Sequence, residues 1–394
     1  MKLAQRAMAL KPSATLAISA RAKELAAAGK DVLDFGVGEP DFPTPRHIVD
    51  ATITALNNGR TKYSPASGTP ELKQAVSGYY KKKYGLSYSV KEIVINAGAK
   101  HSLYNIFQAI IDPGDEVILP APYWVSYPPQ IEMAGGTVVV VTADDTTDFR
   151  VSAAEIEKAI TKRTKALVLN SPSNPTGSVY TKEELTAIAD ACVSRGVYII
   201  YDEIYENNIY GRQHVCLATL SEKVREHTIL VNGASKSYAM TGYRIGYILG
   251  PADLISAVGN IQSHSTSNPT TFCMDATVAA ITGPEDAVNM MRAEFEKRRD
   301  VFVAGMRTIP GVTCTKPDGA FYILPNFKGV LGKAISGKVY TTTQELAKGM
   351  LEDELIACVP GEEFGAPGYI RFSYATSMAT IEKAIARIRA WLSK

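Results

Sequence analysis

ALVLNSPSNPTGSVYTKEELTAIADACVSRGVYIIYD, residues 166–202, is the stretch that decides the fold. Two short apolar runs, 166–170 and 198–202, flank a segment with helical spacing at 182–194. Short apolar strands that alternate with helices are typical of a mainly parallel sheet that is covered on both faces. This stretch therefore predicts two strands of such a sheet with a helix between them.

The same alternation continues on both sides of this stretch. Further apolar runs lie at 92–96, 116–119, 137–141, 228–231 and 245–249, and helical spacing lies at 99–111 and 123–134. Because these runs are short and apolar, we expect one mainly parallel, seven-stranded sheet between helices. The fold class predicted for residues 46–284 is α/β, in one large domain.

After residue 284 the pattern changes. The sequence predicts a long charged helix at 285–306, short strands at 321–324, 356–359 and 370–374, and a closing helix at 381–392. This mixture is typical of a smaller α+β domain. We expect that domain to comprise residues 285–394 together with the N-terminal segment, 1–45.

Charge and hydropathy exclude several classes of protein. The 394 residues include 42 Lys and Arg and 40 Asp and Glu, a formal net charge of +2. Such a balance argues against nucleic acid or an anionic membrane as the main partner. No apolar run approaches the roughly 18–20 residues that span a bilayer, and Arg6, Lys11 and Pro12 interrupt the start of the chain before any signal-like apolar region.

The cysteines and histidines give no sign of a disulfide framework or a metal site. The five cysteines are far apart, and the five histidines lack the spacing of metal ligands. We therefore expect a reduced, cytoplasmic protein without metal, whose cysteines are small core residues. The cysteines are Cys192, Cys216, Cys273, Cys314 and Cys358.

Polar residues follow two neighbouring predicted strands. Asn174, in the turn-like sequence Asn-Pro-Thr-Gly, comes shortly after the strand at 166–170, and Asp202 ends the strand at 198–202, just before Tyr205. Open α/β sheets bind ligands at the carboxyl ends of their strands. Asn174 could be a turn residue or a ligand. A carboxylate at the tip of a buried strand needs a partner, so for Asp202 we favour pairing with a cationic ring nitrogen over a helix N-cap.

The third motif contains a lysine and an arginine. Ser235 and Lys236 follow the strand at 228–231, and Arg244 comes eight residues after the lysine. Small residues flank Lys236, which lies between two buried-strand patterns, so we expect its side chain to point inward. A desolvated lysine has a lowered pKa and becomes a nucleophile that can form a Schiff base.

Together these motifs resemble the fold-type-I pyridoxal-phosphate enzymes of the aspartate aminotransferase family (class I aminotransferases). The chain is similar in particular to the bacterial branch that acts on aspartate or prephenate. Other segments that look like this family are KPSAT (11–15), VGEPDF (37–42), KYSPASG (62–68), NAGAK (96–100), PYWVSYP (122–128), STSNP (265–269), PDGAFY (317–322) and RFSYAT (371–376).

The resemblance implies roles around the cofactor, pyridoxal 5'-phosphate. Lys236 would hold it as a Schiff base and move the proton of the substrate, and Asp202 would keep its ring nitrogen protonated. Tyr205 and Asn174 would bind its 3' oxygen, and Trp124 would stack on its ring. Lys236, Asp202 and Tyr205 are thus the predicted catalytic residues.

The cofactor phosphate needs fixed donors. By the same resemblance these are the backbone N–H groups of Gly98 and Ala99 at a helix start, the Arg244 guanidinium, and Tyr63 from a neighbouring subunit. Related enzymes often carry Ser where this chain has Gly233, and Ser235 is the candidate substitute.

The substrate would be held by its carboxylates. Arg371 would clamp the α-carboxylate beside the Gly38 backbone, with Trp124 and Asn174 also at the substrate. No arginine near residues 263–267 matches the second carboxylate site of the best-known relatives. Candidates for that site are Lys11, Thr15 and Lys100.

The resulting prediction is a cytoplasmic homodimer that moves the amino group of L-aspartate to 2-oxoglutarate by a ping-pong mechanism. Two alternatives stay open: a prephenate or aromatic amino-acid aminotransferase of the same family, and a pyridoxal-phosphate-dependent C–S β-lyase.

Overall fold

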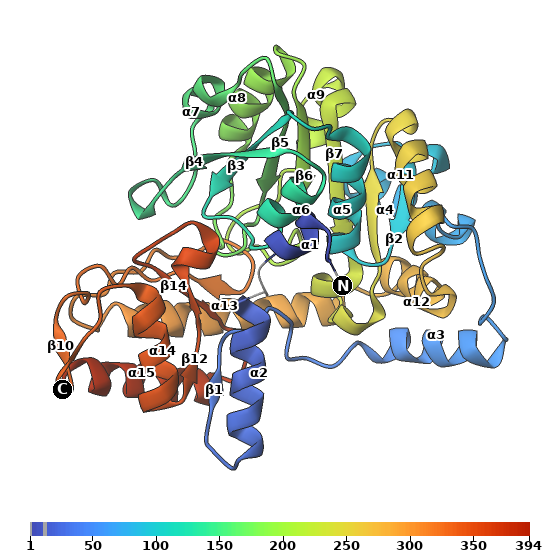
Figure 1. The fold of residues 1–394 in the computed structure, drawn as a ribbon. Coiled ribbons are helices and arrows are strands. Elements are labelled where there is room, and N and C mark those ends of the chain that lie inside the picture. Colours follow the sequence, from blue (N-terminus) through green and yellow to red (C-terminus); the bar gives the residue numbers. More distant parts are fainter. Residues whose placement is uncertain (1, 11–13) are drawn as a thin grey trace.

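A seven-stranded sheet forms the centre of the larger part of the molecule (Figure 1). The computed structural model describes residues 2–10 and 14–394. The strand order is β2-β8-β7-β6-β5-β3-β4; β8 runs antiparallel to both of its neighbours, and the other pairs are parallel. The predicted α/β class and mainly parallel seven-stranded sheet are therefore confirmed. The strands are β2 (Ile93–Asn96), β3 (Glu116–Ala121), β4 (Thr137–Thr142), β5 (Thr164–Asn170), β6 (Tyr198–Asp202), β7 (Thr228–Gly233) and β8 (Gly246–Leu249).

Helices cover both faces of this sheet because the strands are apolar on both faces. In β5, Leu167 and Leu169 belong to a core that helices α4 and α8 complete, whereas Val168 belongs to a second core with α5 and α11. This alternation follows from the two-residue period of a strand. The helices of this part are α3 (Arg46–Asn57), α4 (Pro70–Tyr84), α5 (Ala99–Ile110), α6 (Tyr127–Met133), α7 (Ala153–Ala159), α8 (Lys182–Val193), α9 (Glu222–His227), α10 (Ala234–Ser237), α11 (Ala252–Ser265) and α12 (Thr271–Thr282).

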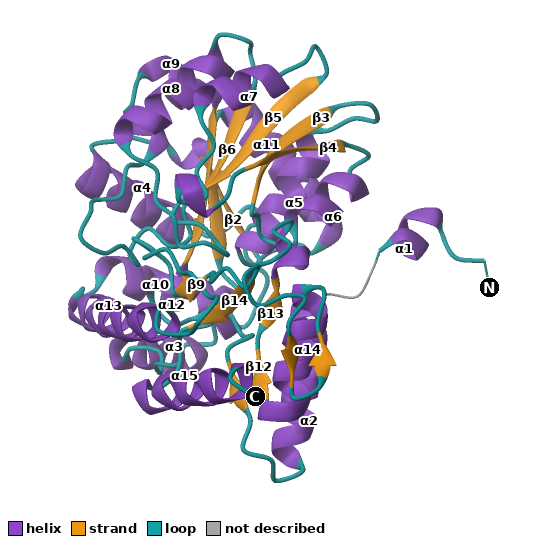
Figure 2. Cartoon of the chain, turned by 90° about the vertical axis from the view of Figure 1, so that its left-hand side faces the viewer, coloured by secondary structure: helices purple, strands orange, loops and turns teal. Residues whose placement is uncertain are grey.

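The smaller part is an α+β assembly around a three-stranded antiparallel sheet, β13-β14-β9 (Figures 1 and 2). The N-terminal segment joins it, since β1 (Leu33–Asp34) pairs in parallel with β12 (Ile356–Ala357). The remaining elements are α1 (Gln5–Ala9), α2 (Ala14–Ala27), α13 (Asp286–Met306), β9 (Tyr322–Ile323), β10 (Ala334–Ile335), β11 (Lys338–Val339), α14 (Thr343–Glu354), β13 (Val359–Pro360), β14 (Ile370–Ser373) and α15 (Met378–Leu392).

Two predicted elements differ from the observed ones. The helix expected over 123–134 begins only at Tyr127, because the Tyr123 backbone N–H donates to the Phe364 carbonyl of the smaller part and residues 123–126 form a turn. The strand expected over 356–359 is two short strands, β12 and β13, because the chain leaves its pairing with β1 and pairs next with β14. Both differences arise from contacts with distant segments.

The structure can be compared with the composition in two respects, the state of the cysteines and the presence of membrane-spanning helices. All five cysteines are buried and unpaired, as predicted. Among the residues that the structure describes, no helix combines the length and the apolar character needed to cross a bilayer.

Candidate active site

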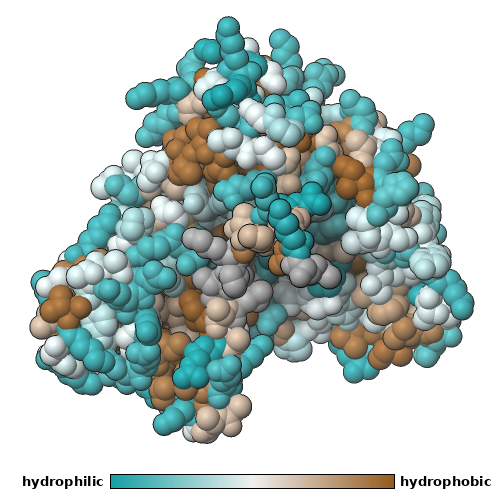
Figure 3. All heavy atoms as spheres, viewed as in Figure 1, coloured by the Kyte–Doolittle hydropathy of each residue, from teal (hydrophilic) through white to brown (hydrophobic). Residues whose placement is uncertain are grey.

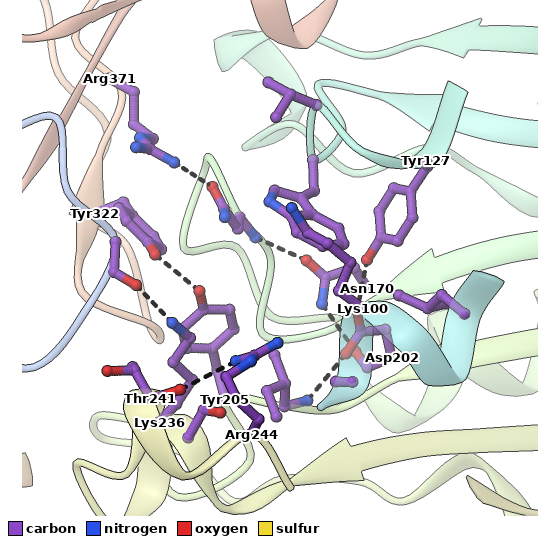
Figure 4. A pocket seen from close by; sticks show the side chains of 18 residues that line it. Lys100, Tyr127, Asn170, Asp202, Tyr205, Lys236, Thr241, Arg244, Tyr322 and Arg371 are labelled. Atoms are coloured by element: carbon purple, nitrogen blue, oxygen red, sulfur yellow. Dashed lines mark hydrogen bonds between the residues drawn. The ribbon is translucent and has the colours of Figure 1, made fainter. Parts of the chain in front are cut away.

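A cavity of about 330 Å³ lies where the carboxyl ends of β5 and β6 and the start of α10 meet the smaller part (Figure 4). Asn170 and Asp202 reach it from the strand ends, Lys236 reaches it from α10, and Arg371 reaches it from β14. Its size and place are those of a small-molecule site in an open α/β sheet.

Most of the residues predicted for the site line this cavity. They are Gly38, Ala99, Lys100, Trp124, Asn174, Asp202, Tyr205, Ser235, Lys236, Arg244 and Arg371. Gly98 lies directly behind the Arg244 guanidinium. Tyr63 does not line the cavity of its own chain and is 92% exposed. Lys11 and the side chain of Thr15, which is part of α2, lie outside the described part.

Asp202 is a buried carboxylate, and two hydrogen bonds fix its orientation. The Tyr127 hydroxyl donates to its Oδ2 at 2.7 Å, and the Ile204 backbone N–H donates to its Oδ1 at 3.2 Å. Burial raises the pKa of Asp202 to about 6, and the hydrogen bond from Tyr127 partly opposes this rise. A cation placed against this carboxylate would relieve the cost of its burial.

Lys236 is half-buried and its amine points into the cavity. Its Nζ donates to the Gly38 carbonyl oxygen at 2.5 Å. Burial lowers the pKa of Lys236 to about 8, and the positive charges of Arg244 and Arg371 lower it further, against the opposing charge of Glu39. A fraction of this amine is neutral near physiological pH, as a nucleophile or a proton acceptor requires.

Arg371 carries a buried charge on the other side of the cavity. Its Nη1 donates to Asn174 Oδ1 at 2.9 Å, and its Nη2 donates to the Gly36 carbonyl oxygen at 2.7 Å. Its Nε has no partner among the described residues, and burial lowers the pKa of the guanidinium. Since both hydrogen-bond partners are neutral, a carboxylate is the ligand that this guanidinium lacks.

A cradle for an anion is built between α5 and Arg244. Gly98, with φ +88°, precedes the first turn of α5, and an added Cβ there would lie 2.4 Å from Arg244 Nη2. A Cβ on Gly246 would lie 2.3 Å from the Ala99 backbone nitrogen. The two glycines therefore let a guanidinium approach the positive end of a helix. A phosphate fits between such donors.

At Gly233, the position for which the resemblance suggested a serine, the structure has no room for a side chain. An added Cβ at Gly233 would lie 2.7 Å from the Ile245 carbonyl oxygen, so a larger residue would push the two strands apart. The side chains of Ser235 and Thr241 line the cavity and offer hydroxyl groups in its place.

Of the three residues predicted to bind a second carboxylate, Lys100 is the one whose side chain the structure describes. Its Nζ lies over the Trp124 ring, 4.9 Å from the centroid. Burial lowers the pKa of Lys100, and the nearby Arg244 adds to the effect. A negatively charged group at this position would be stabilised by the amine.

Seven of the lining residues were not predicted from the sequence, among them Tyr127, Asn170 and Tyr322. Tyr127 holds Asp202, and Asn170 links Asp202 to Asn174 by donating to the Asp202 carbonyl oxygen and accepting from the Asn174 N–H, both at 2.8 Å. The Tyr322 hydroxyl lies 2.8 Å from that of Tyr205. Asn170 ends a predicted strand and could have been found by that position. Tyr322 ends the PDGAFY segment (317–322) that resembles the family, but the sequence indicated no role for its side chain.

Comparisons with known proteins identify the family and the fold of the chain. The family model for aminotransferase class I and II matches residues 30–388. The aspartate aminotransferase of Bacillus subtilis is 48% identical over 395 residues, which cover 100% of both chains. Crystal structures of aspartate aminotransferases from Rhizobium meliloti (TM-score 0.96, 41% identity, 100% and 99% of the two chains) and from Thermus thermophilus with maleate (TM-score 0.94, 42% identity, 99% of each chain) are similar throughout.

Proposed function

The chain belongs to the class I and II aminotransferase family, and from this membership we propose that it transfers the amino group of L-aspartate to 2-oxoglutarate, with pyridoxal 5'-phosphate as cofactor. The observation that carries the proposal is one cavity that joins a half-buried amine, a buried carboxylate, an anion cradle and a buried guanidinium. These are Lys236, Asp202, the Gly98–Arg244 pair and Arg371.

The residues present fit the cofactor at each of its polar groups. When bound, pyridoxal phosphate withdraws electrons from the α-carbon of an amino acid and so makes its proton acidic. Lys236 Nζ would attach to its aldehyde, Asp202 would hold its ring nitrogen, and Arg244 with the start of α5 would hold its phosphate. Tyr205 and Asn174 would face its ring oxygen, and Trp124 would lie against the ring.

Lys236 is the group that would move the substrate proton. Its pKa of about 8 places the amine close to the pH at which a base is most effective. The Gly38 carbonyl that accepts from its Nζ would orient the amine once it is free of the cofactor. Asp202, held by Tyr127, would keep a proton on the ring nitrogen through charge pairing.

Substrate carboxylates would be bound at opposite ends of the cavity. Arg371 would bind the α-carboxylate, since its guanidinium already has Asn174 and Gly36 as neutral partners. Lys100 would bind the distal carboxylate, with Lys11 and Thr15 as the other candidates. The Thermus thermophilus structure with maleate, a dicarboxylate, supports this class of substrate.

We further propose a cytoplasmic homodimer whose large domain comprises residues 46–284 and whose small domain comprises 1–45 and 285–394. Tyr63 is almost fully exposed and would serve the phosphate of the neighbouring subunit. Hydrophobic atoms gather over α3 (Figure 3), where Ile53 and Leu56 are exposed, and α1 reaches away from the body and buries none of its residues (Figure 2). The five unpaired cysteines suit a reducing compartment.

The test is the visible spectrum of the purified holoenzyme, with aspartate and then 2-oxoglutarate added. We expect the cofactor band to bleach with aspartate and to return with 2-oxoglutarate. Aspartate should be converted to its oxo acid in the first half-reaction, and 2-oxoglutarate to its amino acid in the second. An absorption band that does not change when aspartate is added would refute the substrate assignment. Release of pyruvate and ammonia from cystathionine without any oxo acid would indicate the C–S lyase instead, and a higher kcat/KM with prephenate as amino acceptor would indicate the prephenate enzyme.

A further inference from the structure

Tyr322 is a fully buried tyrosine for which the proposed reaction has no role so far. It begins β9, which pairs with β14 so that Tyr322 lies opposite Ser373 and close to Arg371. Its side chain lines the cavity between Arg371 and Tyr205 (Figure 4). In the proposed site, Arg371 binds the substrate carboxylate and Tyr205 faces the cofactor.

The first contact of Tyr322 is with the guanidinium of Arg371. The Arg371 Cζ lies 4.6 Å from the centroid of the Tyr322 ring and 5.0 Å from that of Phe364. A cation over an aromatic face is attracted by the ring, and the attraction grows when both are desolvated. The Arg371 guanidinium is thus stabilised by two aromatic rings, and one of them is the ring of Tyr322.

The second contact is with the hydroxyl of Tyr205. The two hydroxyl oxygens are 2.8 Å apart, and within the described part of the chain Tyr205 is the one hydrogen-bond partner of the Tyr322 hydroxyl. Each hydroxyl has a single proton to donate. If Tyr205 donates to a ligand in the cavity, Tyr322 must donate to Tyr205.

We propose that Tyr322 is a positioning residue that couples the two ends of the site: its ring holds the Arg371 guanidinium, and its hydroxyl directs the Tyr205 proton toward the cofactor. This inference rests on the proposed function, in which Arg371 binds the substrate carboxylate and Tyr205 faces the cofactor oxygen. The resulting chain runs from Tyr322 to Tyr205 to the cofactor.

The coupling has a direction. Burial raises the pKa of Tyr322, and the charge of Arg371 over its ring opposes this rise and so strengthens the hydroxyl as a donor. Hydrogen bonds in a chain also strengthen one another. A carboxylate bound at Arg371 neutralises part of this charge and weakens the chain. By reciprocity, the state of the cofactor alters the affinity for the carboxylate.

The steric surroundings match this role. An added Cβ on Gly38 would lie 2.5 Å from the Tyr322 hydroxyl oxygen, so this glycine leaves room for that hydroxyl. The Gly38 carbonyl accepts from Lys236, and Tyr322 therefore also abuts the segment that contacts the amine.

The test compares the wild-type holoenzyme with Tyr322→Phe, which keeps the ring and removes the hydroxyl. The control is Tyr374→Phe, a buried tyrosine of the smaller part whose hydroxyl donates to the Ala320 carbonyl. Each protein is titrated with acid and base while the visible band of the bound cofactor is followed, with and without saturating maleate. A strong hydrogen-bond donor to the ring oxygen of the bound cofactor would favour its deprotonated form and would therefore lower the midpoint of the band.

We expect Tyr322→Phe to raise the midpoint by about 0.3 pH units, since one cooperative hydrogen bond is lost. Maleate bound at Arg371 should also raise the midpoint, because it weakens the chain, and this rise should be smaller in Tyr322→Phe than in the wild type. Tyr374→Phe should match the wild type in both measurements. Because its ring still holds Arg371, Tyr322→Phe should keep its maleate affinity, whereas Tyr322→Leu should weaken it roughly threefold or more.

A Tyr322→Phe midpoint and maleate response equal to those of the wild type would overturn the coupling, as would a lowered midpoint. If Tyr322→Leu does not fold, the phenylalanine variant still decides. The wild-type spectrum tests the proposed function separately. If the wild-type band responds to aspartate while Tyr322→Phe has the wild-type midpoint and maleate response, only the coupling is rejected. A wild-type protein that binds no cofactor would reject both.

Discussion

The hydrogen bond from Tyr127 to Asp202 gives a prediction that can be worked out quantitatively. Its 2.7 Å length, its burial and the carboxylate acceptor place it among charge-assisted hydrogen bonds. Such bonds contribute about 1.5–3 kcal/mol, and one pH unit corresponds to about 1.4 kcal/mol. We therefore expect Tyr127→Phe to raise the pKa of Asp202, now about 6, by about 1–2 pH units.

The sign of the pH effect follows from which form of Asp202 binds the cofactor. The ionised carboxylate pairs with the protonated ring nitrogen, so cofactor affinity should fall as the pH decreases through the pKa of Asp202. In Tyr127→Phe this loss should begin about 1–2 pH units higher. Near pH 9 the two proteins should bind the cofactor about equally well, because the carboxylate is then largely ionised in both.

The assay is the dissociation constant of pyridoxal phosphate between pH 5 and pH 9, measured in a Lys236→Ala background so that the amine does not titrate. Tyr201→Phe is the matched control, because this buried tyrosine precedes Asp202 in β6 and its hydroxyl donates to the Val215 carbonyl. An acid limb at the same pH in the Tyr127→Phe and Tyr201→Phe proteins would refute the reasoning.

Four further substitutions test other parts of the site. Asp202→Asn should still bind the cofactor through Lys236 and the phosphate cradle, although with lower affinity, and should lower kcat by about 100-fold or more, since the ring nitrogen loses its charge partner; unchanged turnover would remove this role. Arg371→Lys should raise KM for aspartate roughly 10–100-fold, because a lysine cannot reproduce the planar fork, and an unaltered KM would place the carboxylate elsewhere. Gly98→Ala should weaken pyridoxal phosphate binding about tenfold or more, through its positive φ and its approach to the Arg244 guanidinium, and equilibrium dialysis can measure this. Lys100→Met should lower kcat/KM for aspartate about tenfold more than for alanine, and equal losses would refute its contact with the distal carboxylate.

Local patterns in the sequence determined the elements and the ends of the strands. The apolar runs that became β5 and β6 are buried on both faces, so their composition alone predicts a covered parallel sheet. Asp202 and Lys236 follow such runs, and a polar residue at the end of a buried strand can be recognised without knowing its partner. For this reason the strands, Asp202 and Lys236 were predictable from local patterns, whereas most of the other lining residues were named from the resemblance to the family.

Tertiary structure alone decided which groups meet across the cavity. Arg371 binds the Gly36 carbonyl across 335 residues of sequence, and Tyr322 meets Tyr205 across 117. The same holds for the division of the predicted strand at 356–359 and for the space that excludes a side chain at Gly233. The first two depend on how β9 and β14 pack against the ends of the large sheet, the third on pairing with β1 and β14, and the fourth on the approach of β7 to β8. Sequence periodicity records which face of an element is apolar, but it carries no information about the distant surface that this face or an adjacent polar residue will contact.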